Sequence, residues 1–319
     1  MNKSFPIIEL LPDLLALISR RLDLIEDFVA FRGVCTSWRV AARKQIFHQL
    51  VPTVPLLMLA EKEDRDEWEF YSLSRCKIWR NLSVPKTKNK KCMESRGWLI
   101  TVGIAGEMNL LHPFSVLSAS PPSSPDKWLD FVLMVVYNGG AYLEFWRSGD
   151  KSWTGVEKQD GGAFSDVNFY YGKFYAIAHN GHIYIFWEPY LVEMPGDLVV
   201  VARDGTSLDD DDNYRATDFL VIQLDLTNRK WNEITSLGDR SIFLGYNAAF
   251  SVEAAGFPGI IRPSCIYFTD DCIESYHCSE QEGGKDMGIY NLENGKIERF
   301  DDIQSFSSIS PPVWVALSF

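Results

Sequence analysis

Three residues of types that bind metals, Cys272, His277 and Cys278, lie within one short segment of the sequence. A structural zinc site needs four ligands, and its cysteines and histidines usually come in close pairs. This segment lacks the paired spacing and would need a fourth ligand from elsewhere in the chain. We therefore interpret it as a loop and expect no metal site.

The six cysteines do not predict a disulfide framework, because they are spread thinly over 319 residues. Reduced thiols are the simpler interpretation for a chain of this length. The cysteines outside the segment just described are Cys35, Cys76, Cys92 and Cys265.

The five histidines form no recognisable catalytic pattern. His179 and His182 flank Asn180-Gly181, which is more typical of a surface hairpin than of a metal site. The sequence also has no Gly-x-Ser-x-Gly elbow, no P-loop and no Gly-x-Gly-x-x-Gly after a strand. We therefore expect a non-catalytic protein with no cofactor. The other histidines are His48, His112 and His277.

The formal net charge of −12 would repel a phosphate backbone, so we expect no nucleic-acid partner. No apolar stretch reaches the roughly 18 to 20 residues of a membrane helix, and the N-terminus lacks the pattern of a secretory signal. We expect no membrane partner and a location in the nucleus, the cytoplasm or both. A lysine run is either a nuclear-import signal or a solvated loop. It consists of Lys86, Lys88, Lys90 and Lys91.

The elements that must position any functional residue begin with a helical segment. Leu14, Ile18 and Leu22 are spaced at i, i+4 and i+8, and they predict an amphipathic helix over residues 12–22. Pro12 falls in its first turn, where proline is tolerated because the N–H it lacks would have no partner there.

Two further short helices are predicted in the next 25 residues. One covers residues 26–35 and carries acids in its first turn, and the other runs to about residue 47 with Ser37 as its cap. Three short helices cannot bury much surface by themselves, so this small all-α domain over residues 1–50 needs a partner.

From residue 51 to residue 319 the chain becomes a succession of short apolar runs separated by turn residues, which predicts a large all-β domain. Asn-Gly pairs at residues 138–139, 180–181 and 294–295 predict tight hairpin turns and therefore antiparallel meanders. The predicted strands are residues 56–59, 69–73, 97–102, 108–111, 131–137, 142–146, 174–178, 183–187, 198–202, 219–225, 242–244, 265–269, 288–291 and 313–317.

A weak internal repeat favours one all-β architecture. Trp79, Trp153 and Trp231 each follow a strand and a polar turn, and each precedes an aliphatic residue by three positions. Ile297 stands at the tryptophan position of a fourth, weaker copy. The spacing is about twice that of propeller blades, which indicates a β-propeller of five or six blades. A β-sandwich or a partly open barrel is the alternative.

The N-terminal segment resembles the F-box family. The resemblance rests on Leu11-Pro12-Asp13-Leu14-Leu15, followed by Ile18, Leu22, Val34-Cys35 and Trp38-Arg39.

The remainder resembles the plant KIB-type β-propeller family, formerly catalogued as a domain of unknown function. The signatures are Arg96-Gly97-Trp98, Leu110-Leu111-His112-Pro113-Phe114, Gly172-Lys173-Phe174-Tyr175-Ala176 and Ile266-Tyr267-Phe268-Thr269-Asp270-Asp271.

These resemblances imply a substrate receptor of an SCF-type ubiquitin ligase. The F-box would bind a Skp-type adaptor, and through it a cullin, while the propeller would hold a protein target for ubiquitination. The sequence identifies no target-binding residues. The residues that we expect to carry the docking surface and its immediate packing are Leu11, Pro12, Leu14, Leu15, Ile18, Leu22, Val34 and Trp38.

Three alternatives remain open. Several of these residues, above all Trp38 and Val34, could only hold the three helices together. The protein could be an F-box scaffold or inhibitor that acts outside the ligase. It could also be a ligand-binding propeller with a vestigial F-box, which would need a concave pocket with convergent polar groups.

Overall fold

The computed structural model describes most of the chain between residues 10 and 316. The described residues are 10–22, 24–42, 54–59, 68–82, 90–95, 98–103, 105, 107–111, 132–137, 140–147, 150–156, 162–170, 173–179, 187–204, 207–208, 214–225, 228, 230–246, 248–271, 286–300, 303, 305 and 310–316.

Three α-helices come first in the chain: α1 (Pro12–Ser19), α2 (Ile25–Gly33) and α3 (Thr36–Ala41). Helix α1 begins at Pro12, so the prediction of proline in its first turn is confirmed. It ends at Ser19, before the predicted residue 22. None of the described helices has the length and hydropathy to cross a membrane.

The predicted cap of the third helix is wrong. Cys35, not Ser37, is the N-cap residue of α3, because its extended backbone (φ −165°, ψ 176°) ends the preceding turn. Ser37 lies inside the helix. The predicted end of this helix near residue 47 lies outside the described residues.

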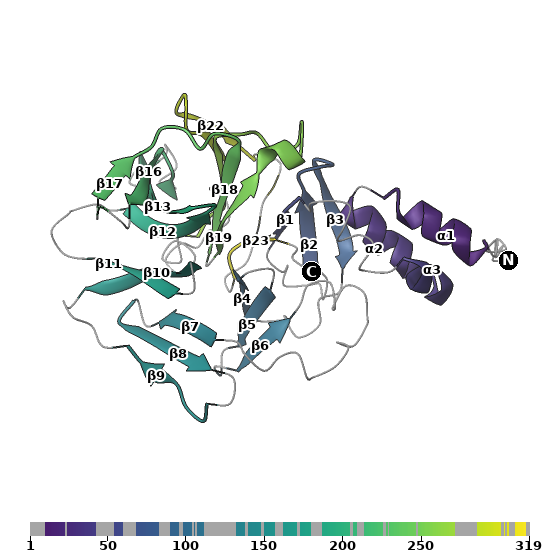
Figure 1. Cartoon of the computed structure of the whole chain (residues 1–319), viewed down its shortest axis with the longest axis horizontal. Coiled ribbons are helices and arrows are strands. Elements are labelled where there is room, and N and C mark those ends of the chain that lie inside the picture. The colour runs from purple at the N-terminus through teal and green to yellow at the C-terminus, as the bar shows by residue number, and fades with distance from the viewer. Residues whose placement is uncertain are drawn as a thin grey trace.

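The rest of the described chain is a β-propeller, as predicted (Figure 1). Five sheets of three to five strands form its blades, and two-stranded ribbons complete the sheets of the described residues. The blade number agrees with the lower of the two predicted values.

The first blade joins the two ends of the propeller, in the order β23-β1-β2-β3. The second and third blades have the orders β4-β5-β6 and β7-β8-β9. Their strands are β1 (Leu56–Met58), β2 (Trp68–Ser72), β3 (Lys77–Leu82), β23 (Val313–Val315), β4 (Lys90–Ser95), β5 (Trp98–Gly103), β6 (Met108–Leu111), β7 (Val132–Tyr137), β8 (Tyr142–Arg147) and β9 (Thr154–Gly155).

A ribbon of β10 (Ala163–Tyr170) and β11 (Lys173–His179) follows. The fourth blade has the order β12-β13-β16-β17, with a small ribbon of β14 and β15 between its middle strands in sequence. These strands are β12 (Trp187–Met194), β13 (Asp197–Asp204), β14 (Ser207–Leu208), β15 (Tyr214–Arg215), β16 (Asp218–Asp225) and β17 (Lys230–Glu233).

The fifth blade has the order β19-β18-β20-β21-β22. All described strand pairs are antiparallel except β18 with β20, so the prediction of antiparallel meanders holds with this one exception. Its elements are β18 (Arg240–Gly245), β19 (Ala248–Glu253), the 3-10 helix η2 (Ala254–Gly256), β20 (Cys265–Phe268), β21 (Gly288–Asn291) and β22 (Lys296–Arg299).

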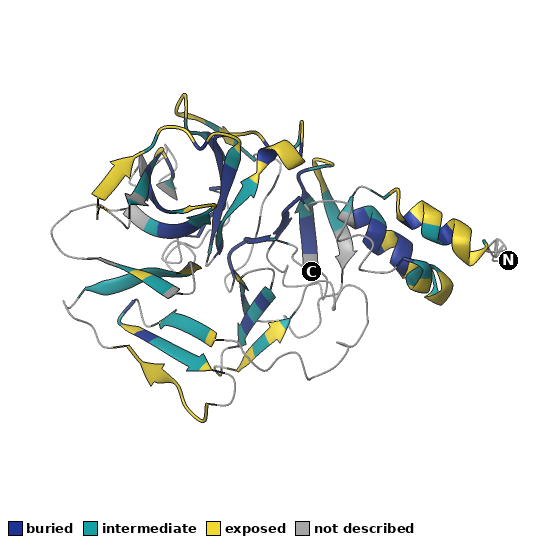
Figure 2. Cartoon of the chain, in the orientation of Figure 1, coloured by how far each residue is buried: buried dark blue, intermediate teal, exposed yellow. Residues whose placement is uncertain are grey.

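Strand β23 closes the ring by pairing with β1, so that Leu57 lies between Tyr71 and Trp314. The Trp314 side chain is fully buried and meets the ring of Phe243, from β18 of the fifth blade, edge-on at 5.0 Å. The last described strand therefore belongs to the first blade and packs on the fifth. Figure 2 shows that buried residues concentrate in these strands, whereas β9, β17 and much of α1 are exposed.

Two predicted local features differ in the structure. The turn after β21 has four residues, with Gly295 at φ +69°, not the two of a tight hairpin. The repeat tryptophans mark outer strands, but in unequal register. The pair nearest the turn ends at Lys77 in the first blade and at Lys230 in the fourth. Trp79 follows Lys77 by two positions, whereas Trp231 follows Lys230 by one. The two side chains therefore point to opposite faces of their blades.

Side chains of β10 connect the ribbon to the fourth blade. The Asp166 carboxylate accepts a hydrogen bond from the Leu191 N–H at 2.7 Å, and the Asn168 amide donates to the Leu191 carbonyl at 2.8 Å. Both backbone groups of one β12 residue are thus satisfied by two side chains of β10. Burial raises the pKa of Asp166 to about 7, although hydrogen bonds from Leu191 and Val167 oppose this.

We expect Asp166 to make the protein less stable as the pH rises from about 4 to 7. Its pKa is raised in the folded state from 3.8, so the folded chain keeps a proton that the unfolded chain releases in this window. The free energy of unfolding should fall by at most about 1.4 kcal/mol per pH unit from this group.

The measurement is urea unfolding at several pH values, for the wild type and for Asp166→Asn. The variant should lose this pH dependence, because asparagine does not titrate. Any hydrogen bond that it loses would change the free energy of unfolding by the same amount at every pH. Asp239→Asn, at an exposed position, is the control. Parallel pH profiles for the wild type and Asp166→Asn would contradict the assignment.

Candidate partner-docking site

One face of α1 packs into the core. Leu15 is only 1% exposed, and Ser19, one turn further on, is buried and donates its hydroxyl to the Ala16 carbonyl at 2.9 Å. Leu15 belongs to one apolar cluster with Phe28 of α2 and Met58 of β1. The helices therefore share a core with the first blade.

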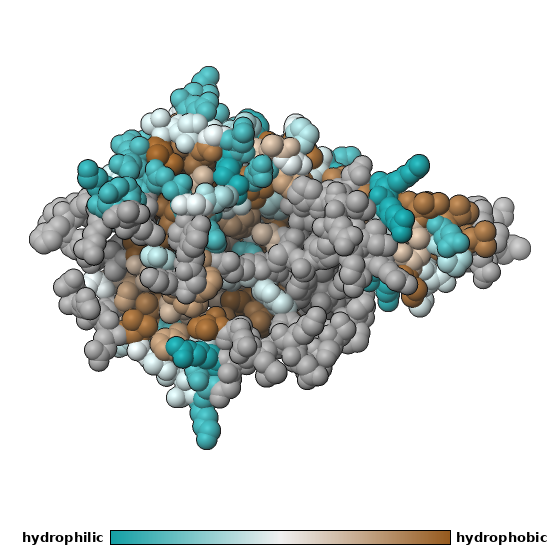
Figure 3. Space-filling model, in the orientation of Figure 1, coloured by the Kyte–Doolittle hydropathy of each residue, from teal (hydrophilic) through white to brown (hydrophobic). Residues whose placement is uncertain are grey.

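The side of α1 next to this buried face carries exposed apolar side chains. Leu11 is 67% exposed, and Leu14 and Ile18 follow it at i+3 and i+7 on the same side of the helix. Leu17, which the sequence analysis did not select, is 55% exposed. Figure 3 shows apolar surface over α1, at the end of the molecule away from the propeller. We call Leu11, Leu14, Leu17 and Ile18 the α1 patch.

Two arginines hold α2 and α3 together by donating to each other's backbone. Arg32 donates to the carbonyl oxygens of Arg39, at 3.1 Å, and Ala42, while the Arg39 Nε donates to the Arg32 carbonyl at 3.3 Å. These carbonyls lie at helix ends, where they have no intrahelical partner. Burial lowers the pKa of Arg32, and the nearby charge of Arg39 lowers it further.

Trp38 and Val34 differ in their surroundings. The Trp38 ring lies 4.4 Å from the Phe31 ring and packs on the shared core, so this side chain joins α3 to α2. Val34 is 47% exposed, which does not support the interpretation that it only holds the helices together. Val40 on α3 is also exposed.

The predicted docking residues therefore fall into two groups. Exposed residues can meet a partner directly, whereas the others position them from inside. The exposed group is Leu11, Pro12, Leu14, Ile18 and Val34, and the packed group is Leu15, Leu22 and Trp38. Leu17 and Val40 join the exposed group. The i+3 spacing from Leu14 could have identified Leu17.

Acidic residues in the first turn of α2 attach the helices to the first blade. The buried Glu26 carboxylate accepts a hydrogen bond from the Ser72 hydroxyl of β2. Asp27 forms an ion pair with Arg75, in the turn between β2 and β3. The helical module is therefore fixed to the propeller by polar contacts as well as by the shared core.

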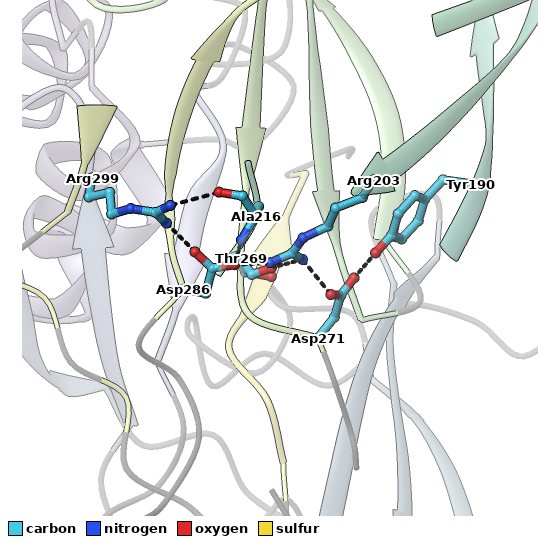
Figure 4. Close-up of polar contacts among 7 residues, drawn as sticks. All are labelled: Tyr190, Arg203, Ala216, Thr269, Asp271, Asp286 and Arg299. Carbon is cyan, nitrogen blue, oxygen red and sulfur yellow. Dashed lines mark hydrogen bonds and ion pairs between the residues drawn. The ribbon is translucent and has the colours of Figure 1, made fainter. Parts of the chain in front are cut away.

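A second cluster of ionisable groups lies inside the propeller (Figure 4). Arg203 of β13 forms ion pairs with Asp271 and Asp286, each at 2.5 Å, and donates to the Thr269 carbonyl at 2.9 Å. Asp286 also pairs with Arg299 of β22. The sequence analysis missed this cluster, although Thr269 and Asp271 belong to a quoted family signature.

The charges of this cluster balance, with two guanidinium groups facing two carboxylates. Burial raises the pKa of Asp271, and the Arg203 guanidinium and the Tyr190 hydroxyl oppose the rise. Asp286 also accepts the Ala216 N–H at 2.7 Å. Since the Arg203, Asp271 and Asp286 side chains are at most 4% exposed, we interpret the cluster as a link between the fourth and fifth blades.

The described residues contain no group of three or more His, Cys, Asp or Glu side chains that could hold an ion. The segment with Cys272, His277 and Cys278 lies outside the described residues.

Comparisons with known proteins agree with this arrangement. The sequence model of the KIB1-4 beta-propeller matches residues 70–291. The Arabidopsis thaliana F-box protein SKIP23 is 22% identical, with 95% of this chain and 94% of that protein aligned. F-box protein At2g17036 from the same plant is 23% identical over 96% and 94% of the two chains. The F-box/kelch-repeat protein At1g57790 of that plant is 24% identical over 90% of each.

We expect the same substitution at two neighbouring leucines of α1 to change the stability by very different amounts. Leu15→Ala should reduce the free energy of unfolding by about 2 to 5 kcal/mol, because it leaves a cavity in the shared core. Leu14→Ala should change it by no more than about 0.5 kcal/mol, because that side chain is exposed. Chemical unfolding measures both, and equal effects would contradict the assigned orientation of α1.

Removing the central cation of the buried cluster should also be costly. Arg203→Met leaves the buried Asp271 carboxylate without its cationic partner, while Asp286 keeps Arg299, and should cost about 3 to 5 kcal/mol. Arg262→Met is the matched control, because the Arg262–Glu298 pair is exposed and should contribute less than about 1 kcal/mol. Thermal unfolding of the two variants compares them, and a similar small loss in both would show that the cluster does not link the blades.

Proposed function

Because the chain belongs to the KIB1-4 β-propeller family and aligns over nearly its whole length with plant F-box proteins, we propose that it is the substrate receptor of an SCF-type ubiquitin ligase. Residues 1–50 would bind a Skp-type adaptor and through it a cullin. Residues 51–319 would hold the protein target. The chain itself would perform no catalysis, and its place of action would be the nucleus, the cytoplasm or both.

The observation that carries this proposal is the α1 patch. Its four large aliphatic side chains are exposed on one short helix, while the neighbouring Leu15 anchors that helix in the core. Burial of apolar surface contributes roughly 25 cal/mol per Å², so such a contiguous patch favours association with a complementary groove. Amphipathic helices commonly bind partners in this way.

The attachment of α2 to the first blade supports the same proposal. A receptor must hold its target at a defined position relative to the ligase. The Glu26 and Asp27 contacts, with the core shared by Leu15 and Met58, connect the adaptor-facing helices to the first blade of the propeller. Target contacts would come from propeller loops, where binding residues usually lie.

The test is binding of the full chain to a purified Skp-type adaptor. Leu14→Glu with Ile18→Glu places charges in the α1 patch and should weaken binding at least about tenfold, as expected for central residues of an interface. Glutamate preserves helix propensity, so the fold should be kept.

Val132→Glu in the third blade is the control, because Val132 is 41% exposed and Ile18 is 40% exposed. It should leave the affinity unchanged. A well-folded wild-type chain that does not bind the adaptor would refute the proposal. Adaptor binding without any change in the turnover of co-purified partners would favour the scaffold alternative.

A further inference from the structure

We propose that the adaptor groove for the α1 patch ends in an acidic rim, which Arg20 and Arg21 contact. The inference rests on the proposed function. It adds the charge of the partner's surface and the direction in which α1 lies on it. The partner would then have an apolar groove for the aliphatic side chains and carboxylates beside its far end.

The positions of the two arginines follow from α1. Arg20 is the C-cap residue of the helix, and its N–H donates to the Ala16 carbonyl at 3.2 Å. The Arg21 N–H donates to the Ile18 carbonyl at 2.9 Å. The backbone that carries both side chains is therefore held against the last turn of α1. Arg20 follows Leu17 by three positions and Arg21 by four, so both continue the exposed face.

Both side chains are exposed, and neither forms an ion pair with another described residue. The other arginines near the helices are engaged. Arg32 and Arg39 donate to backbone carbonyls, and Arg75 pairs with Asp27. Among the described residues of the helical module, Arg20 and Arg21 are thus the cations left for a partner.

None of the acids of the module that the structure describes neutralises this end of α1. Glu26 is bonded to Ser72 and Asp27 to Arg75, on the side that faces the propeller. Asp13 lies in the first turn of α1, at the other end of the patch, about 10 Å away at 1.5 Å per residue. The patch is therefore flanked by an acid at its beginning and by two cations at its end.

The charge of the whole chain strengthens the contrast. Residues 1–50 carry seven Lys and Arg against five Asp and Glu, whereas the chain as a whole has a net charge of −12. An acidic partner is therefore repelled by the propeller and attracted to the helices. Such complementarity steers encounter and fixes orientation more than it adds to affinity. It also selects one direction of α1 in an otherwise apolar groove.

A simpler role for the two arginines is to stabilise α1 itself, because cations at a helix C-terminus interact favourably with the helix dipole. This role predicts a change in stability and no change in adaptor binding beyond that. The two explanations are therefore separated by measuring affinity and stability on the same variants.

The experiment measures association and dissociation rates of the full chain with a purified Skp-type adaptor, from about 50 to 300 mM salt, where screening becomes strong. Arg20→Gln with Arg21→Gln should weaken binding about fivefold or more at low salt, mainly through slower association. The salt dependence should become flatter. Arg20→Lys with Arg21→Lys should restore most of the association rate, because the charge is kept.

Lys151→Gln with Lys230→Gln is the control. Both lysines are exposed on the propeller, and this double variant removes the same charge. It should leave the rates unchanged. Unchanged affinity and salt dependence in the arginine variant, with binding still lost in Leu14→Glu, Ile18→Glu, would overturn the acidic rim and leave the proposed function standing. No binding by the wild type at any salt concentration would overturn both.

Discussion

The central constraint on this molecule is that three helices of eight, nine and six residues cannot form a core of their own. They solve it by burying one face, with Leu15 and Phe28, against Met58 of the first blade. The same packing turns the other face of α1 to solvent. The residues of α1 outside this packing remain exposed, and those of the α1 patch are large and aliphatic.

The propeller meets a related constraint, since each blade must be joined to its neighbours through faces that are not fully apolar. Between the fourth and fifth blades, Arg203 neutralises two buried carboxylates, and the apolar cluster around Ile242 and Val201 packs alongside. Between the β10–β11 ribbon and the fourth blade, Asp166 and Asn168 bond both backbone groups of Leu191. These polar links are directional, so they specify how neighbouring sheets align as well as holding them together.

The two constraints together determine where the helices lie relative to the propeller. The helices are attached to the outer side of the first blade, which is also the blade that β23 closes. A target on the propeller and an adaptor on α1 would therefore be held by one continuous packed body.

The amino-acid sequence by itself determined the order and type of the main elements, because periodicity and turn residues act within a few positions. The start of α1 at Pro12, strands such as 108–111 and 288–291, and the propeller resemblance follow from that local information. Strands with less regular patterns, such as β10 and β12, were not predicted.

Only the tertiary structure decided which side of each element is covered. Leu14 and Leu15 are the same residue type in adjacent positions, and their exposure differs because Leu15 packs into the cluster that includes Phe28 of α2, whereas Leu14 does not. Arg203 and Asp286 are 83 residues apart, and no local pattern predicts that they meet. Burial and pairing depend on what packs from elsewhere in the chain, and that is the information which a local pattern does not contain.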